Sequence, residues 1–168
     1  MNVRPERATD SAALRRLNEA AFGRPDEADL VQALAAANAV TLSLVAEIDD
    51  ELAGHILFSP VVLDPEGGRS EVVGLAPMAV LPGRQRRGVG SALVRVGLDE
   101  LRRRGFEAVV VLGHPDYYPR FGFTPASRFA LRCEFACSDD AFMALALRRG
   151  GLTGPAGVVR YRPEFARF

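Results

Sequence analysis

The fold is decided by the stretch Arg84-Gln85-Arg86-Arg87-Gly88-Val89-Gly90-Ser91. It lies between an apolar run at 72–81, typical of a strand, and an amphipathic stretch at 92–104, typical of a helix. A helix N-terminus leaves about four backbone N–H groups without an intrahelical partner and carries partial positive charge. The two glycines let an anion approach these groups, and the arginines add guanidinium donors. This order therefore predicts an anion site suited to a pyrophosphate.

Two other phosphate-binding loops fit less well. The dinucleotide fingerprint needs a third glycine three places after Gly90, where this chain has Leu93. The P-loop spacing from Gly83 to Gly88 is present, but Val89 stands where its lysine belongs. All 21 basic side chains of the chain are arginines. ATP binding through a P-loop would therefore lack its characteristic cation.

The pattern that does fit is Gln85-x-x-Gly88-x-Gly90 after a strand. It resembles the acyl-CoA pyrophosphate loop of the GCN5-related N-acetyltransferases (GNAT). A second match follows downstream, where Tyr118 is separated by three residues from Gly122-Phe123. Together with the stretch Gly54-His55-Ile56-Leu57-Phe58-Ser59-Pro60, this set resembles a bacterial branch of predicted N-acetyltransferases. The resemblance runs from about residue 3 to the C-terminus, which implies one GNAT domain over residues 1–168.

The expected fold class is α/β, with a three-layer α/β/α arrangement around a mixed central sheet. The resemblance implies that this sheet is splayed, as in the GNAT fold. Helical spacing predicts helices at 11–21, 26–38, 92–104 and 139–149. Strand-like segments are 41–48, 52–63, 72–81, 109–112, 129–135 and 158–161, with a hairpin at Asp49-Asp50 and a loop at 64–69. The strands at 72–81 and 109–112, joined by a helix, should be parallel.

The resemblance implies acetyl-CoA as co-substrate and direct transfer of the acetyl group to an amine. The pyrophosphate would meet the loop, and the pantetheine arm would pair with the preceding strand as an added strand does. Cofactor-binding residues are then Met78, Ala79, Val80, Gln85, Arg86, Arg87, Gly88, Val89, Gly90 and Ser91. Pro77 lacks an N–H and predicts a bulge or splay in that strand. The resemblance makes Tyr118 the acid for the leaving thiolate, with Tyr117 an equal contender. The alternative role for Tyr118 is that of a core aromatic packed on Phe121 and Phe123.

The general base stays open. Glu27, Glu71, Asp116 and His114 are candidates, as is water held by backbone carbonyls. His55 lies inside an apolar strand and is interpreted as a hydrogen-bonded core histidine rather than a catalytic one. Arg120 fits either an anion-binding role or a structural salt bridge.

Composition limits the partners, location and metal sites that we expect for this protein. The chain is 48% apolar and 25% charged, with a formal net charge of zero, which disfavours nucleic acid as a partner. No signal sequence or 18-residue apolar stretch occurs, so we expect a cytoplasmic protein without a membrane partner. Cys133 and Cys137 should be reduced there, and with only two histidines we expect no metal site. The sequence does not identify the acceptor, and it is compatible with a homodimer. The alternative function is that of a non-catalytic CoA sensor.

Overall fold

A computed structural model describes residues 1–64 and 71–167, and it divides into two units. The first unit holds residues 1–59, 76–98 and 163–168, and the second holds residues 60–75 and 99–162. Within the described residues, no helix is long and apolar enough to cross a membrane.

The first unit is built on antiparallel strands. β1 (Asn2–Pro5) pairs with β2 (Leu42–Ile48), and β2 pairs with β3 (Glu51–Pro60). Asp49 and Asp50 join β2 to β3 with φ values of 53° and 62°, the left-handed pair that a tight two-residue hairpin requires. The predicted hairpin is therefore confirmed. The second half of β5 (Val72–Val80) follows β3 in the strand order.

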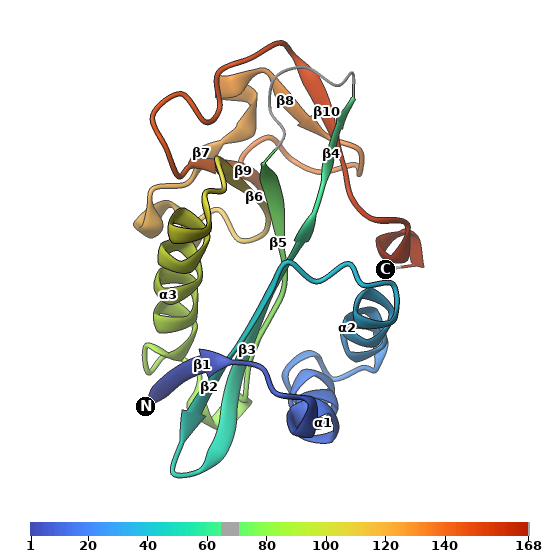
Figure 1. Cartoon of the computed structure of the whole chain (residues 1–168), viewed down its shortest axis with the longest axis vertical. Coiled ribbons are helices and arrows are strands. Elements are labelled where there is room, and N and C mark those ends of the chain that lie inside the picture. Colours follow the sequence, from blue (N-terminus) through green and yellow to red (C-terminus); the bar gives the residue numbers. More distant parts are fainter. Residues whose placement is uncertain (65–70, 168) are drawn as a thin grey trace. The chain divides into compact units, whose positions relative to one another are not determined.

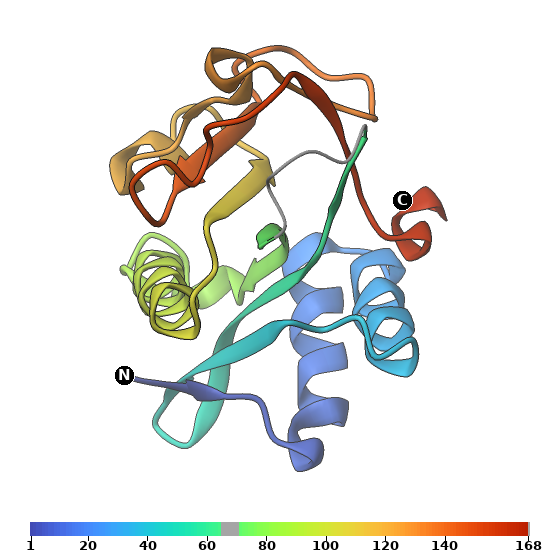
Figure 2. The same ribbon diagram turned by 45° about the horizontal axis from the view of Figure 1, so that its top comes forward.

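Helices cover both faces of these strands (Figure 1). α1 (Ser11–Phe22) and α2 (Asp26–Ala36) lie side by side (Figure 2), as the helical spacing predicted. His55 on β3 contacts Asn18 of α1. Phe58, three residues further along β3, packs against Gly97 of α3 (Val89–Arg104). Because successive side chains of a strand point to opposite faces, α1 and the first part of α3 lie on opposite sides of β3.

The second unit has two sheets. In the larger one, β6 (Ala108–Leu112) lies between the first half of β5, which is parallel to it, and β9 (Phe142–Ala146), which is antiparallel. β7 (Thr124–Pro125) completes this side of the sheet. The smaller sheet has the order β4 (Val62–Asp64), β10 (Gly157–Arg160), β8 (Leu131–Cys133). The predicted parallel pairing of the two strands that flank the helix is confirmed.

Short 3-10 helices complete the chain: η1 (Ala8–Asp10), η2 (Pro82–Arg84), η3 (Tyr118–Phe121), η4 (Ala126–Phe129) and η5 (Pro163–Arg167). The mixed sheet with flanking helices confirms the α/β fold class.

Four predicted elements differ. The strand expected at 129–135 is only the three residues of β8, because η4 extends to Phe129. The helix expected at 139–149 is wrong, because residues 142–146 form β9 and pair along the whole of β6. The strand expected at 52–63 is two strands, β3 and β4, separated at Val61. The helix expected at 92–104 begins one turn earlier, at Val89. The loop expected at 64–69 falls, beyond Asp64, outside the described residues.

Candidate functional site

The glycine loop has the backbone of a helix entry. Arg86 and Gly88 both have left-handed φ values, 58° and 84°, and α3 starts immediately afterwards at Val89. The Ala92 N–H donates to the Gly88 carbonyl at 2.9 Å, which is the first intrahelical bond. The N–H groups of residues 88–91 precede that bond, so they are the four that a helix leaves without an intrahelical acceptor. A Cβ at position 88 would meet no atom within 4 Å apart from its chain neighbours.

The side chains of the loop fall into two groups. The Gln85 amide donates to the Val80 carbonyl at 3.1 Å, and Arg84 lies 3.6 Å from Asp49 in an ion pair. Both therefore hold the loop against its neighbours. Arg86 and Arg87 are exposed, and no ion pair to either occurs in the described part of the chain. Their guanidinium groups are available to an anion that reaches the helix N-terminus.

Gly54 positions the start of α3, a role that the sequence reasoning missed. A Cβ at Gly54 would lie 2.8 Å from Val89 Cγ1 and 2.9 Å from Leu93 Cδ1. It would also lie 3.3 Å from the Ala79 carbonyl. The first turn of α3 therefore sits directly on the backbone of β3. The signal was present as a single glycine inside an apolar strand, which often marks a close approach of another segment.

The strand that precedes the loop presents alternating side chains. Ala79 is buried, while Met78 and Val80 are half-buried, and the Leu81 N–H donates to the Ala53 carbonyl at 3.0 Å. The Ala76–Pro77 peptide bond is cis. Among the described residues, β5 and β6 are in register only over Val72–Gly74 and Ala108–Val110. The predicted splay beyond that point and the pairing with a pantetheine arm stay predictions.

Tyr118 lies in the second unit, at the start of η3, and is 6% exposed. Its ring meets Tyr117 and Phe123 edge to face, with centroids 5.1 and 5.7 Å away, and a Cβ on Gly113 would overlap it. Burial raises the pKa of the Tyr118 phenol, so the group stays protonated at neutral pH. Tyr117 is half-buried, beneath the Arg120 guanidinium at 4.7 Å. Tyr118 thus has the packing role that the sequence allowed, and its chemical role stays a prediction.

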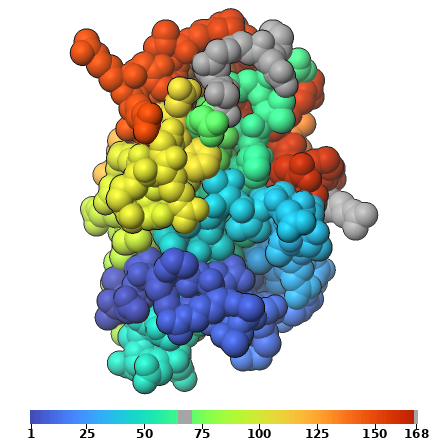
Figure 3. Space-filling view, in the orientation of Figure 1, coloured from blue at the N-terminus to red at the C-terminus, as the bar shows by residue number. Residues whose placement is uncertain are grey.

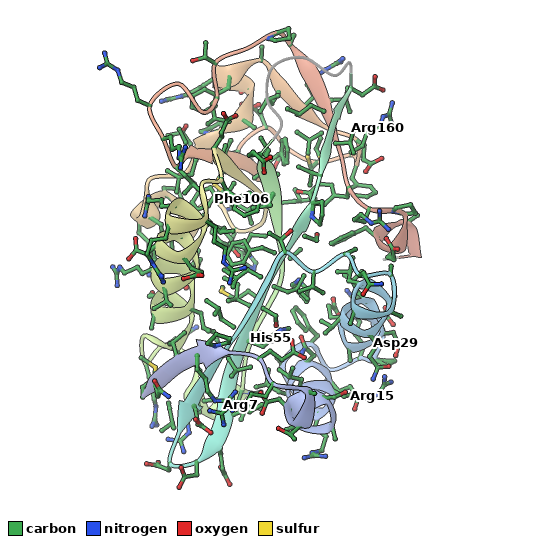
Figure 4. The ribbon with its side chains drawn as sticks, in the orientation of Figure 1. Arg7, Arg15, Asp29, His55, Phe106 and Arg160 are labelled. Carbon is green, nitrogen blue, oxygen red and sulfur yellow. The ribbon has the colours of Figure 1, made fainter. Side chains whose placement is uncertain are left out.

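His55, labelled in Figure 4, is fully buried and has hydrogen-bond partners on both ring nitrogens, which confirms its interpretation as a core histidine. The Asn18 amide, which also donates to the Leu14 carbonyl, lies 3.3 Å from His55 Nδ1. His55 Nε2 lies 3.0 Å from Ser43 Oγ, and that hydroxyl donates to Glu6 at 2.5 Å. Because Ser43 uses its proton on Glu6, His55 Nε2 must be the donor to Ser43. Burial lowers the pKa of His55 to about 4.

The four candidate bases come from both units, Glu27 from the first and the other three from the second. Glu27 is held in an ion pair by Arg24, and Glu71 is exposed in the second unit. His114 and Asp116 are exposed in the segment after β6. Among the described residues of each unit, nothing distinguishes one of these as a base.

A family model for the acetyltransferase (GNAT) domain matches residues 2–126, and the chain belongs to this family. The N-acetyltransferase YhbS of Escherichia coli K12, itself called uncharacterized, is 38% identical over 169 residues, covering 100% of both chains. YjhQ of the same strain, also called an uncharacterized N-acetyltransferase, is 40% identical over 121 residues, covering 71% of this chain and 67% of YjhQ.

Two similar proteins have solved structures with a bound cofactor. The crystal structure of E. coli YhbS in complex with CoA has a TM-score of 0.94 and 37% identity, and covers 99% of this chain and 92% of that one. A GNAT family acetyltransferase from Brucella melitensis in complex with acetyl-CoA has a TM-score of 0.80 and 40% identity, with 98% and 97% covered. These likenesses confirm the family and the fold, and both relatives bind the cofactor that the sequence predicted.

Proposed function

We propose that this protein transfers an acetyl group from acetyl-CoA to an amine by direct attack on the thioester. The observation that carries the proposal is the glycine loop, whose left-handed Gly88 opens the N-terminus of α3. Membership of the acetyltransferase family and the CoA and acetyl-CoA complexes of two relatives support the same cofactor here.

The pyrophosphate is the part of the cofactor that the loop suits. Backbone N–H groups of residues 88–91 and the guanidinium groups of Arg86 and Arg87 supply donors on one short segment. Hydrogen bonds to a charged acceptor contribute about 1.5–3 kcal/mol each. Three or four of them account for about 8 kcal/mol, which corresponds to a micromolar dissociation constant.

The pantetheine arm pairs with the backbone of Met78, Ala79 and Val80, as an extended peptide adds to a sheet edge. Pro77 has no N–H to donate, so the nearest donors to the thioester carbonyl are those of Met78 and Ala79. A backbone N–H at this place stabilises negative charge on the carbonyl oxygen as the amine attacks.

The reaction needs one proton donor at its end. The neutral amine forms a C–N bond with the thioester carbon, the tetrahedral intermediate collapses, and the C–S bond breaks to release a CoA thiolate. Tyr118 gives its phenolic proton to that thiolate, and the proton lost by the amine restores the phenol through solvent. Burial keeps the Tyr118 phenol protonated until the thiolate forms, but the same raised pKa makes it a weaker acid towards that thiolate.

The test is a turnover measurement with acetyl-CoA against a panel of small amines, amino acids and peptide N-termini. Mass spectrometry of the acceptor is the better readout, because the exposed Cys137 would consume thiol reagents. The chain has no lysine, so a side-chain amine cannot compete as an internal acceptor. We expect acetylated product and CoA in equal amounts with at least one amine class. Tight CoA binding without turnover on any amine would instead indicate a CoA sensor.

A further inference from the structure

A recess of about 540 Å³ lies in the first unit, between α1 and the β2–β3 hairpin. Its lining includes five apolar residues, here called the floor: Ala13, Leu17 and Ala20, which share one stripe of α1, and Leu52 and Leu81. This volume is in the range of sites for small molecules, about 300–1,000 Å³. None of the residues proposed to bind acetyl-CoA lines it.

One wall of the recess carries excess negative charge. Arg4 donates to Asp10 at 2.7 and 3.1 Å, to Glu47 at 3.2 and 3.5 Å, and to the Pro5 carbonyl at 3.1 Å. These bonds use all five N–H groups of the guanidinium, so Arg4 has no donor left for another molecule. Two carboxylates share this one cation, and the side chains of Arg4 and Asp10 are each only 11% exposed. Hydrogen bonds from Arg4 and from the Arg7 backbone N–H, which donates to Asp10 Oδ2 at 2.7 Å, lower the pKa of Asp10. The exposed Arg7 does not line the recess.

The rim has the same sign of charge. Asp50 and Glu51 lie at the tip of the hairpin, which projects next to the N-terminal segment (Figure 3). Neither forms an ion pair with a residue that the structure describes. Arg16 is the second cation of the lining, so four carboxylates face two guanidinium groups. Such a recess attracts cations and repels anions.

We propose that this recess binds an organic ammonium ion, an alkylamine or polyamine. Its methylene chain lies on the stripe formed by Ala13, Leu17 and Ala20, and its ammonium group donates to the carboxylates of the wall and rim. A wall whose guanidinium is saturated presents acceptors only, so the ligand must supply the donors. The inference does not depend on acetyl transfer, since the site shares no residue with the proposed cofactor site.

The experiment is an amide-resolved NMR titration of the whole chain, without CoA, using spermidine, n-octylamine and the neutral n-octanol. We expect both amines to shift the amide signals of Ala13, Ala20 and Leu52, with binding that weakens as salt is added. n-Octanol should bind much more weakly, because it has no charge. Absence of these shifts with both amines, or equal binding of n-octanol, would overturn the proposal.

Matched variants locate the charge that matters. Asp50→Asn with Glu51→Gln removes two rim charges, and asparagine tolerates the left-handed φ of 62° at position 50. We expect the dissociation constant of spermidine to rise about tenfold at low salt. The control, Asp139→Asn with Asp140→Asn, neutralises two consecutive exposed aspartates that do not line the recess. Equal weakening in the control would show nonspecific attraction and overturn the site.

A second variant tests the floor. Ala20 is an exposed position of α1, so Ala20→Trp should fold normally and fill the recess. Circular dichroism checks the fold. We expect the n-octylamine shifts to disappear, and their persistence at the wild-type affinity would contradict the placement of the methylene chain.

Discussion

Gly88→Asp is the sharpest test of where the cofactor's pyrophosphate binds. The new Cβ would meet no atom within 4 Å, and its carboxylate would stand at the N-terminus of α3, where we propose that the anion binds. At about 5 Å from the diphosphate, with an effective dielectric constant of about 20–30, two unit charges repel by roughly 2–3 kcal/mol. The dissociation constant of CoA should therefore rise about 30- to 150-fold.

Two control variants separate charge from backbone strain. Gly23→Asp introduces aspartate at another left-handed glycine, φ 71°, with no atom within 4 Å of the new Cβ. Gly83→Asp adds the same charge five residues before Gly88, where the backbone is not left-handed and space is open. Gly23→Asp should lose about 1 kcal/mol of stability to strain and keep CoA affinity. Gly83→Asp should change both quantities little.

Isothermal titration calorimetry with CoA, at low and moderate salt, measures the effect. Urea denaturation of all three variants gives the free energy of unfolding. The reasoning is refuted if Gly88→Asp binds CoA as tightly as the wild type. It is also refuted if Gly83→Asp weakens binding as much, because the charge would then act at long range rather than at the helix N-terminus.

Three further predictions concern packing, protonation and chemistry. Gly54→Val should lower the free energy of unfolding by about 1–3 kcal/mol in urea, because its side chain overlaps Val89 and Leu93; Gly83→Val, in open space, is its control. The free energy of unfolding should fall by about 3 kcal/mol in total as pH drops from 6.5 to about 4, because the unfolded chain protonates His55 while the fold holds it neutral. Urea denaturation at several pH values should show this dependence of stability on pH, and His55→Gln should reduce it. Tyr118→Phe should lower kcat at least tenfold without changing KM for acetyl-CoA, whereas Tyr117→Phe should not; a kcat within a factor of two of the wild type in Tyr118→Phe would remove the acid role.

Local chemistry made much of the fold predictable. The Asp49-Asp50 turn, the two N-terminal helices and the glycine loop each carry their signal within a few residues. The role of His55 as a buried, hydrogen-bonded residue was also predictable, because a lone histidine in an apolar strand needs hydrogen-bond partners. Its partners, Asn18 and Ser43, lie far away in sequence, and no local pattern identified them.

The errors arose where long-range pairing decides the structure. Residues 139–149 contain alanine, leucine, methionine and arginine, all good helix formers, yet β6 would lack an antiparallel neighbour without β9. The early start of α3 is similar, because two glycines lower helix propensity around Val89 and contact with Gly54 fixes the turn instead. Proximity between separate parts of the chain, such as the approach of α1 to the hairpin that forms the recess, leaves no local trace in the sequence.

The outer strand of the first unit bears on how the protein should be handled. β1 stands at the end of the strand order, and such a position offers unpaired N–H and C=O groups to other molecules. It is only four residues long and ends at Pro5, which has no N–H, while Arg4 is folded inward onto two carboxylates. An affinity tag rich in β-branched residues before Met1 would lengthen this short edge and create a template for aggregation. A glycine- and serine-rich tag would leave it too short to recruit a neighbour.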